Sequence, residues 1–159
     1  MFEKMLVCLD RSPEAEEILP LIYGEARHFS KIVLLSVLHL PGFQLPVGVP
    51  SEAAGNVQTG KMMNDFKKAQ AETPVYLETK AAPLKEKGCD VETAVLEGVP
   101  ARTIVEYIKE NNVTMLAIAT HGHSGFREIA MGSTAEYLLR NAGIPVMLVT
   151  PHKRGKGKR

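Results

Sequence analysis

The sequence is poor in the residues and segments that mark secreted and membrane proteins. It has no tryptophan and two cysteines, Cys8 and Cys89, which stand far apart and form no C-x-x-C motif. We therefore expect both cysteines to be small buried hydrophobic residues in a reducing compartment, not a disulfide or a metal pair. No apolar run approaches the roughly 18 residues that cross a bilayer, and the N-terminus lacks the pattern of a signal peptide. These absences predict a cytoplasmic protein with no membrane partner.

Charge is nearly balanced over the whole chain but uneven along it. The 159 residues contain 19 basic and 18 acidic side chains, a net charge of +1. Five of the basic residues lie in 151–159, which has no acid, so residues 1–150 hold 14 basic against 18 acidic side chains, a net charge of −4. A negative body disfavours nucleic acid as a partner. We predict one domain over 1–150 and a basic, disordered tail over 151–159.

The first half of the chain alternates between strand-like and helix-like segments. An apolar run over 5–9 predicts a first strand, and 31–38 predicts a second. Between them Ser12 is a suitable helix N-cap and Pro13 a suitable first helical residue, which predicts one helix with an apolar face. Residues 39–60 contain seven prolines and glycines and predict a long loop. A helix over 61–87 should be kinked or split by its two internal prolines and should end at Gly88.

The second half continues the alternation and defines the fold class. Strands are expected over 91–96, 113–119 and 145–150, with helices from Pro100 to about Asn112 and from Gly132 to Asn141. Several strands are apolar on both faces, which is typical of a parallel sheet covered by helices on each side. We predict a single doubly wound α/β domain with a five-stranded parallel sheet. Ligands of such sheets bind at the carboxyl ends of the strands.

A glycine-rich segment after the fourth strand is the strongest functional signal. Gly122, Gly125 and Gly132 allow backbone amides to approach a phosphate, and the helix starting near Ser133 offers amides and a positive dipole end. Hydroxyl groups of Ser133 and Thr134 add donors. The residues alone leave two interpretations open, a phosphate cradle or a plain strand-to-helix loop with a serine cap.

Several motifs occur together in the order and spacing of one known family. In chain order they are Asp10-Arg11-Ser12 after the first strand, the second-strand segment 34–38, Gly98-Val99-Pro100, Ala119-x2-Gly122-x9-Gly132-Ser133, and the final strand 144–149. With these motifs the sequence resembles the nucleotide-binding type of the universal stress protein family over nearly its whole length. The resemblance implies a Rossmann-like domain of the adenine nucleotide alpha hydrolase-like type, with strand order 3-2-1-4-5.

The same resemblance implies a ligand and the residues that bind it. The expected ligand is ATP, with AMP or ADP as alternatives, and Mg²⁺ carried on the phosphates. Asp10 would bond the ribose or adenine end, and the backbone of Val37 would read the adenine edge. Gly122, Gly125, Gly132 and Ser133 would surround the phosphates. Ala119 and Thr134 complete the expected binding set.

The function implied is that of an ATP-binding signalling or stress-response module, with at most slow hydrolysis. Ala119 replaces the first glycine of the motif, so a protein of the same fold without a nucleotide is the main alternative. Thr120-His121-Gly122-His123 also matches a motif of adenylyltransferases, a less favoured interpretation because it follows the fourth strand. The apolar edge segment 144–150 implies a homodimer through that strand, as in the family.

Overall fold

The computed structural model describes residues 2–39, 56–120 and 132–150. Five parallel strands form one sheet in the order β3-β2-β1-β4-β5, which confirms the predicted fold and strand order. The strands are β1 (Phe2–Cys8), β2 (Phe29–Leu38), β3 (Val91–Glu97), β4 (Met115–Ala119) and β5 (Val146–Val149). Because all five run the same way, their carboxyl ends share one edge.

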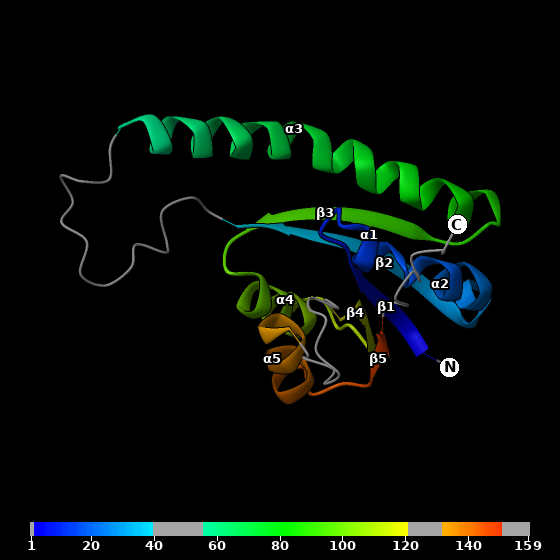
Figure 1. Cartoon of the computed structure of the whole chain (residues 1–159). Coiled ribbons are helices and arrows are strands. Elements are labelled where there is room, and N and C mark those ends of the chain that lie inside the picture. The colour runs from blue at the N-terminus through cyan, green and yellow to red at the C-terminus, as the bar shows by residue number, and fades with distance from the viewer. Residues whose placement is uncertain (1, 40–55, 121–131, 151–159) are drawn as a thin grey trace, which may run out of the picture.

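Helices cover both faces of the sheet, as Figure 1 shows. One face carries α1 (Pro13–Glu16), α2 (Leu19–Glu25) and the long α3 (Asn56–Glu86); a short 3-10 turn, Ala26–His28, follows α2. The other face carries α4 (Pro100–Glu110) and α5 (Ser133–Asn141). Among the described helices, none combines the length and the apolar character that a membrane crossing requires.

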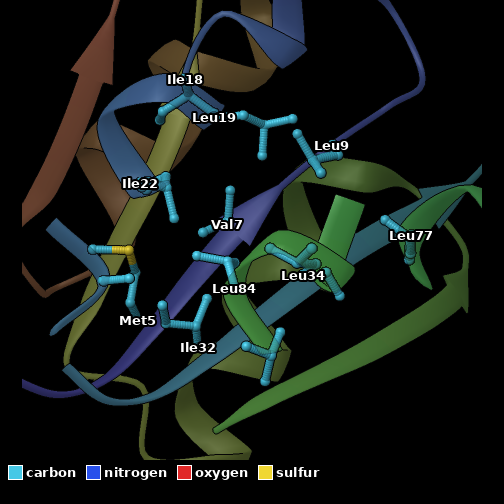
Figure 2. Packing of buried hydrophobic residues seen from close by; sticks show 14 of the residues in the cluster. Met5, Val7, Leu9, Ile18, Leu19, Ile22, Ile32, Leu34, Leu77 and Leu84 are labelled. Atoms are coloured by element: carbon cyan, nitrogen blue, oxygen red, sulfur yellow. The ribbon is translucent and has the colours of Figure 1, made fainter. Parts of the chain in front are cut away.

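Side chains alternate between two cores because successive residues of a strand point to opposite faces. Met5 and Val7 of β1 are fully buried in the core beneath α1, α2 and α3, which also contains Ile18, Ile22 and Leu77 (Figure 2). Leu6 and Val33 are fully buried on the opposite face, in the core beneath α4 and α5. The apolar character of β1 and β2 on both faces thus follows from their central place in the sheet.

The helix predicted after Ser12 is divided in two. Ser12 is its N-cap, as expected, with the Ser12 Oγ accepting from the Ala15 amide at 3.1 Å. However, α1 ends at Glu16 and α2 begins at Leu19. Pro20 lacks the amide that would bond the carbonyl of Glu16, so a continuous helix loses a hydrogen bond at this point. The apolar stripe survives the break because both pieces bury it in the same core.

The helix that was predicted to be kinked or split by its prolines is not split. Asn56–Glu86 is one helix of 31 residues with Pro74 and Pro83 inside it, although its axis bends along its length in Figure 1. Leu77, Ala81 and Leu84 are fully buried on the sheet, and this packing offsets the amides that the prolines lack. The helix also begins five residues earlier than predicted; residues 40–55 of the predicted loop lie outside the described part.

Gly88 ends α3 as predicted. Its φ of +79° is the left-handed conformation that glycine adopts without strain. The Gly88 amide donates to the carbonyl of Lys85 at 2.9 Å, and the Cys89 amide donates to the carbonyl of Leu84 at 3.1 Å. These bonds satisfy carbonyls that the end of the helix would otherwise leave open.

Candidate functional site

A cavity opens at the carboxyl edge of the sheet where β1 stops short of its neighbour. β1 ends at Cys8, which pairs with Leu35, while β2 continues to Leu38. The resulting space has a volume of about 390 Å³. Its walls are mostly apolar and include residues from five elements on the α4 and α5 side, namely Cys8, Leu35, Ile104, Ile118 and Leu138. Polar groups stand at its rim, which is the usual composition of a small-molecule site.

Six of the eight predicted site residues line this one cavity. They come from the ends of three strands and the start of one helix, and they are Asp10, Val37, Ala119, Gly132, Ser133 and Thr134. The other two, Gly122 and Gly125, lie outside the described residues, as do His121 and His123. Segments more than 100 residues apart in the sequence therefore meet at one place, because parallel topology brings the strand ends to the same edge.

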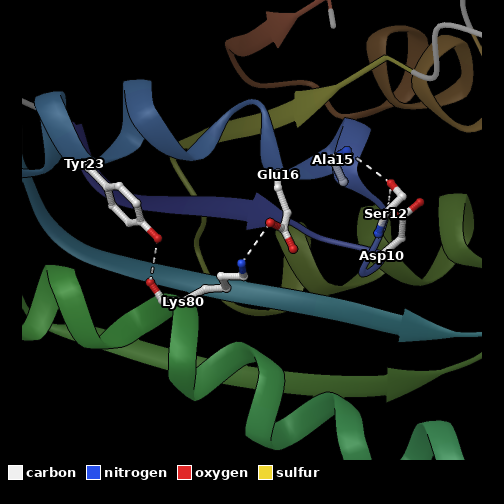
Figure 3. Close-up of polar contacts among 6 residues, drawn as sticks. All are labelled: Asp10, Ser12, Ala15, Glu16, Tyr23 and Lys80. Atoms are coloured by element: carbon white, nitrogen blue, oxygen red, sulfur yellow. Dashed lines mark hydrogen bonds and ion pairs between the residues drawn. The ribbon is translucent and has the colours of Figure 1, made fainter. Parts of the chain in front are cut away.

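Asp10 is held in a tight turn between β1 and α1. Its Oδ1 accepts from the Ser12 amide at 3.0 Å and from the Ser12 hydroxyl at 2.5 Å, as Figure 3 shows. This is an Asx-type turn, in which an aspartate bonds the backbone two residues on. The carboxylate is exposed at the cavity rim. Its direction is therefore fixed by the turn and not by burial.

The backbone of Val37 is directed past the end of β1. The carbonyl of Leu35 accepts from the Leu9 amide at 2.9 Å, whereas the carbonyl of Leu38 accepts from the Gly98 amide on the other side at 2.9 Å. In a strand, residues two apart share one backbone orientation. Val37 therefore directs its N–H and C=O toward the β1 side of β2. It lies beyond the Leu9–Leu35 hydrogen bond, at the place where the cavity opens.

Ala119, which replaces the first glycine of the motif, sits on ordinary strand backbone. It is the last residue of β4 and pairs with Val149. The described non-glycine residues with positive φ are Arg11 and Asn112, so Ala119 has no need of the glycine conformation. Its methyl group narrows the cavity slightly without straining the chain.

The N-terminus of α5 forms the rim opposite Asp10. Gly132 is the N-cap, and it makes no side-chain cap bond. The first amides of a helix have no partner within the helix and carry the positive end of its dipole. Ser133 and Thr134, both exposed, add hydroxyl groups beside them. This rim is therefore suited to a negatively charged group.

The apolar part of the site was not predicted from the sequence. Cys8 was expected only to be a small buried hydrophobic residue, and it packs with Ile104 and Leu138 in the core beneath α4 and α5. Burial raises the pKa of the Cys8 thiol to about 12, so the thiol stays protonated and forms part of a neutral wall. These residues line the cavity because β1 ends before β2 does. The hydrophobic pattern alone locates strand ends poorly.

Comparisons with known proteins agree with this architecture. The family model described as "Universal stress protein family" matches residues 1–150. The universal stress protein YxiE of Bacillus subtilis is 30% identical over 94% of this chain and 99% of its own length. The universal stress protein MJ0531 of Methanocaldococcus jannaschii is 26% identical over 97% of this chain and 85% of its own length.

Solved structures of similar fold include proteins with bound nucleotides. The structure of the protein MJ0577, also of Methanocaldococcus jannaschii, has a TM-score of 0.74 at 22% identity, covering 96% of this chain and 99% of that one. A universal stress protein in complex with cAMP has a TM-score of 0.62 at 17% identity, covering 95% and 98%. An Arabidopsis thaliana member with AMP bound has a TM-score of 0.61 at 17% identity, covering 94% and 92%. With a family match over nearly its whole length, the chain belongs to the universal stress protein family.

Proposed function

We propose that this protein binds an adenine nucleotide, ATP in preference to AMP or ADP, in the cavity at the carboxyl edge of its sheet. The observation that carries the proposal is the convergence of Asp10, Val37 and the start of α5 on one mostly apolar cavity. A base fits the apolar walls, with the Val37 backbone at its edge. Asp10 accepts from hydroxyl groups of the ribose, and the amides at Ser133 bind phosphate. Relatives of the same fold with bound AMP and cAMP support this class of ligand.

The proposed role is that of a binding module in a stress response, with hydrolysis slow at most. Mg²⁺ would arrive on the phosphates: the described residues contain no group of three or more His, Cys, Asp or Glu side chains placed to hold a metal. Binding is tested by native mass spectrometry of the purified protein and by titration calorimetry with ATP, ADP, AMP and adenosine, with and without Mg²⁺. Absence of binding to all four would favour a protein of this fold that acts without a nucleotide.

Replacement of Asp10 by asparagine should weaken nucleotide binding by about 10-fold to 100-fold, since a hydrogen bond to a charged group contributes about 1.5 to 3 kcal/mol. Asparagine retains an oxygen that accepts from the Ser12 amide, so the turn and the melting temperature should change little. Asp90→Asn is the control, because Asp90 is exposed at the opposite edge of the sheet, just before β3. Equal titration curves for Asp10→Asn and Asp90→Asn would remove Asp10 from the site.

We also propose a homodimer through the edge strand β5. All four residues of β5 are half-buried and apolar. The carbonyls of Pro145 and Val149 accept from β4 at 3.0 Å and 2.9 Å, so Val146 and Leu148 direct their backbone groups to the free edge. An open apolar edge can pair with a second strand, and a two-fold axis that lies beside β5 would pair it antiparallel with its copy.

The dimer is tested by a proline that removes one donor from the free edge. Val146→Pro should convert a dimer to a monomer in sedimentation velocity, because the lost amide points away from β4 and serves only the second copy. Val146→Ala is the matched control, since it shortens the same side chain but retains the amide, and it should remain dimeric. A wild-type protein that sediments as a monomer would reject this arrangement.

A further inference from the structure

Arg11 has a backbone conformation that its residue type disfavours, and it stands next to the carboxylate at the cavity rim. Its φ is +67°, in the left-handed region that is costly for a residue with a side chain. The other described non-glycine residue with positive φ is Asn112, a type that tolerates this conformation. Strain of this kind persists where surrounding contacts hold it, and it gathers at functional sites. The conformation of Arg11 reverses the chain so that Asp10 can bond the Ser12 amide.

The contact that holds Arg11 comes from α3. Arg11 Nη2 lies 2.6 Å from Glu72 Oε2, and both side chains are partly exposed. Glu72 is also 3.8 Å from Lys68, one turn earlier on the same helix. Glu72 does not line the cavity, and neither does Arg11, so neither side chain is placed to touch a ligand there.

Further contacts show that the turn and the helix after it are fastened to the same face of α3. Lys80 Nζ pairs with Glu16 Oε2 at 2.8 Å, and the Tyr23 hydroxyl donates to the carbonyl of Lys80 at 3.1 Å (Figure 3). Lys80 also lies over the ring of Tyr76, 5.4 Å from its centre. Burial raises the pKa of Tyr76, and the neighbouring Glu16 and Asp10 raise it further.

We propose that Arg11 is a positioning residue of the nucleotide site, and that its ion pair with Glu72 lets α3 set the direction of the Asp10 carboxylate. The inference rests on the proposed function for its ligand, but the positioning itself is a property of the free protein. Since coupling is reciprocal, a nucleotide that holds Asp10 in place also strengthens the attachment of the turn to α3.

Glu72→Gln tests the proposal without altering any residue of the cavity. The Ser12 amide, which donates to Asp10 Oδ1, should exchange with deuterium about threefold to fivefold faster in this variant, within the range of one exposed ion pair. Affinity for ATP or AMP should fall by a similar factor. Lys68→Gln is the matched control, because it removes the other cation beside Glu72 and leaves Arg11 paired. Identical exchange and affinity in the two variants would overturn the proposal.

Arg11→Gly separates positioning from plain stability. Glycine adopts a φ of +67° without strain, so the melting temperature should not fall, while nucleotide affinity should fall at least as far as in Glu72→Gln. Asn112→Gly relieves the other left-handed residue, far from the cavity in the fold, and should leave affinity unchanged. If the wild-type protein binds no adenine nucleotide, the proposed function fails and the exchange of the Ser12 amide alone decides the positioning role.

Discussion

Ser133→Asp should lower the affinity for ATP and AMP by about 100-fold or more, because it places a negative charge where the phosphates are expected. Like charges brought together at a binding site cost several kcal/mol. The same substitution should raise the free energy of unfolding by about 0.3 to 1 kcal/mol, since an acid in the first turn of α5 interacts well with the helix dipole. Ser133 is exposed, so no core packing is disturbed. Loss of binding together with a gain of stability cannot be explained by misfolding.

Two comparisons make the result for Ser133 specific. Asparagine is nearly the same size as aspartate but uncharged. The Ser133→Asn variant should therefore retain most of the affinity measured by calorimetry. Adenosine lacks phosphate, so its binding to Ser133→Asp should change far less than that of AMP. Equal losses for adenosine and AMP would mean that α5 does not face the phosphates.

Gly98→Ala should destabilise the fold by about 2 to 4 kcal/mol, measured by denaturant unfolding. Gly98 has a φ of +150°, and a Cβ there would lie 2.5 Å from Thr103 Oγ1. Its amide bonds the carbonyl of Leu38 at 2.9 Å, so the turn cannot move aside without breaking a contact with the sheet. The turn leads into Pro100, which lines the cavity, so nucleotide binding should weaken as well.

The cost at Gly98 has two parts that a second substitution separates. Thr103→Ala in the Gly98→Ala background removes the clash but not the backbone strain, so it should restore part of the stability. Gly24→Ala is the opposite control: Gly24 lies in α2 with nothing within 4 Å of its added Cβ, and alanine there should stabilise by up to about 1 kcal/mol. If Gly98→Ala has the same free energy of unfolding as wild type, the predicted backbone strain and clash with Thr103 at this position are contradicted.

Much of the fold follows from local pattern. The apolar runs located all five strands, and Ser12 and Gly88 marked a helix start and a helix end. The errors came where tertiary contacts compete with local preference. Pro20 divides a helix whose apolar stripe runs through it, whereas Pro74 and Pro83 fail to divide one that is packed on the sheet. A proline removes one backbone hydrogen bond in each helix. In α3 the burial of Leu77 and Leu84 on the sheet keeps the helix continuous despite that loss.

The polar part of the site was easier to predict than its apolar part. Asp10 and Ser133 belong to local motifs that carry their own geometry, an Asx-type turn and a helix start. Ile104 and Leu138 face the cavity only because α4 and α5 pack on the same side of the sheet, which no short motif encodes. Residue type tells that such a side chain is buried, but not which void it borders.

Thr114, the residue just before β4, has a direct structural role. Its hydroxyl accepts from the Lys4 amide at 2.9 Å and donates to the Lys4 carbonyl at 3.0 Å. An ionised carboxylate accepts hydrogen bonds but donates none. Threonine therefore joins the start of β1 to β4 through both backbone groups of Lys4, which an aspartate does not do.

The early end of β1 has a consequence for how this family can diversify. The cavity exists because the central strand β1 is shorter than its neighbour β2, with Cys8 the last residue of β1 and Leu38 the last of β2. Because strand lengths create this cavity, it remains when the side chains around it are substituted. Substitutions at Val37 or Ala119 change the size of the cavity, while the scaffold stays intact. A chain with this topology can therefore acquire a cavity of another shape without a change of fold.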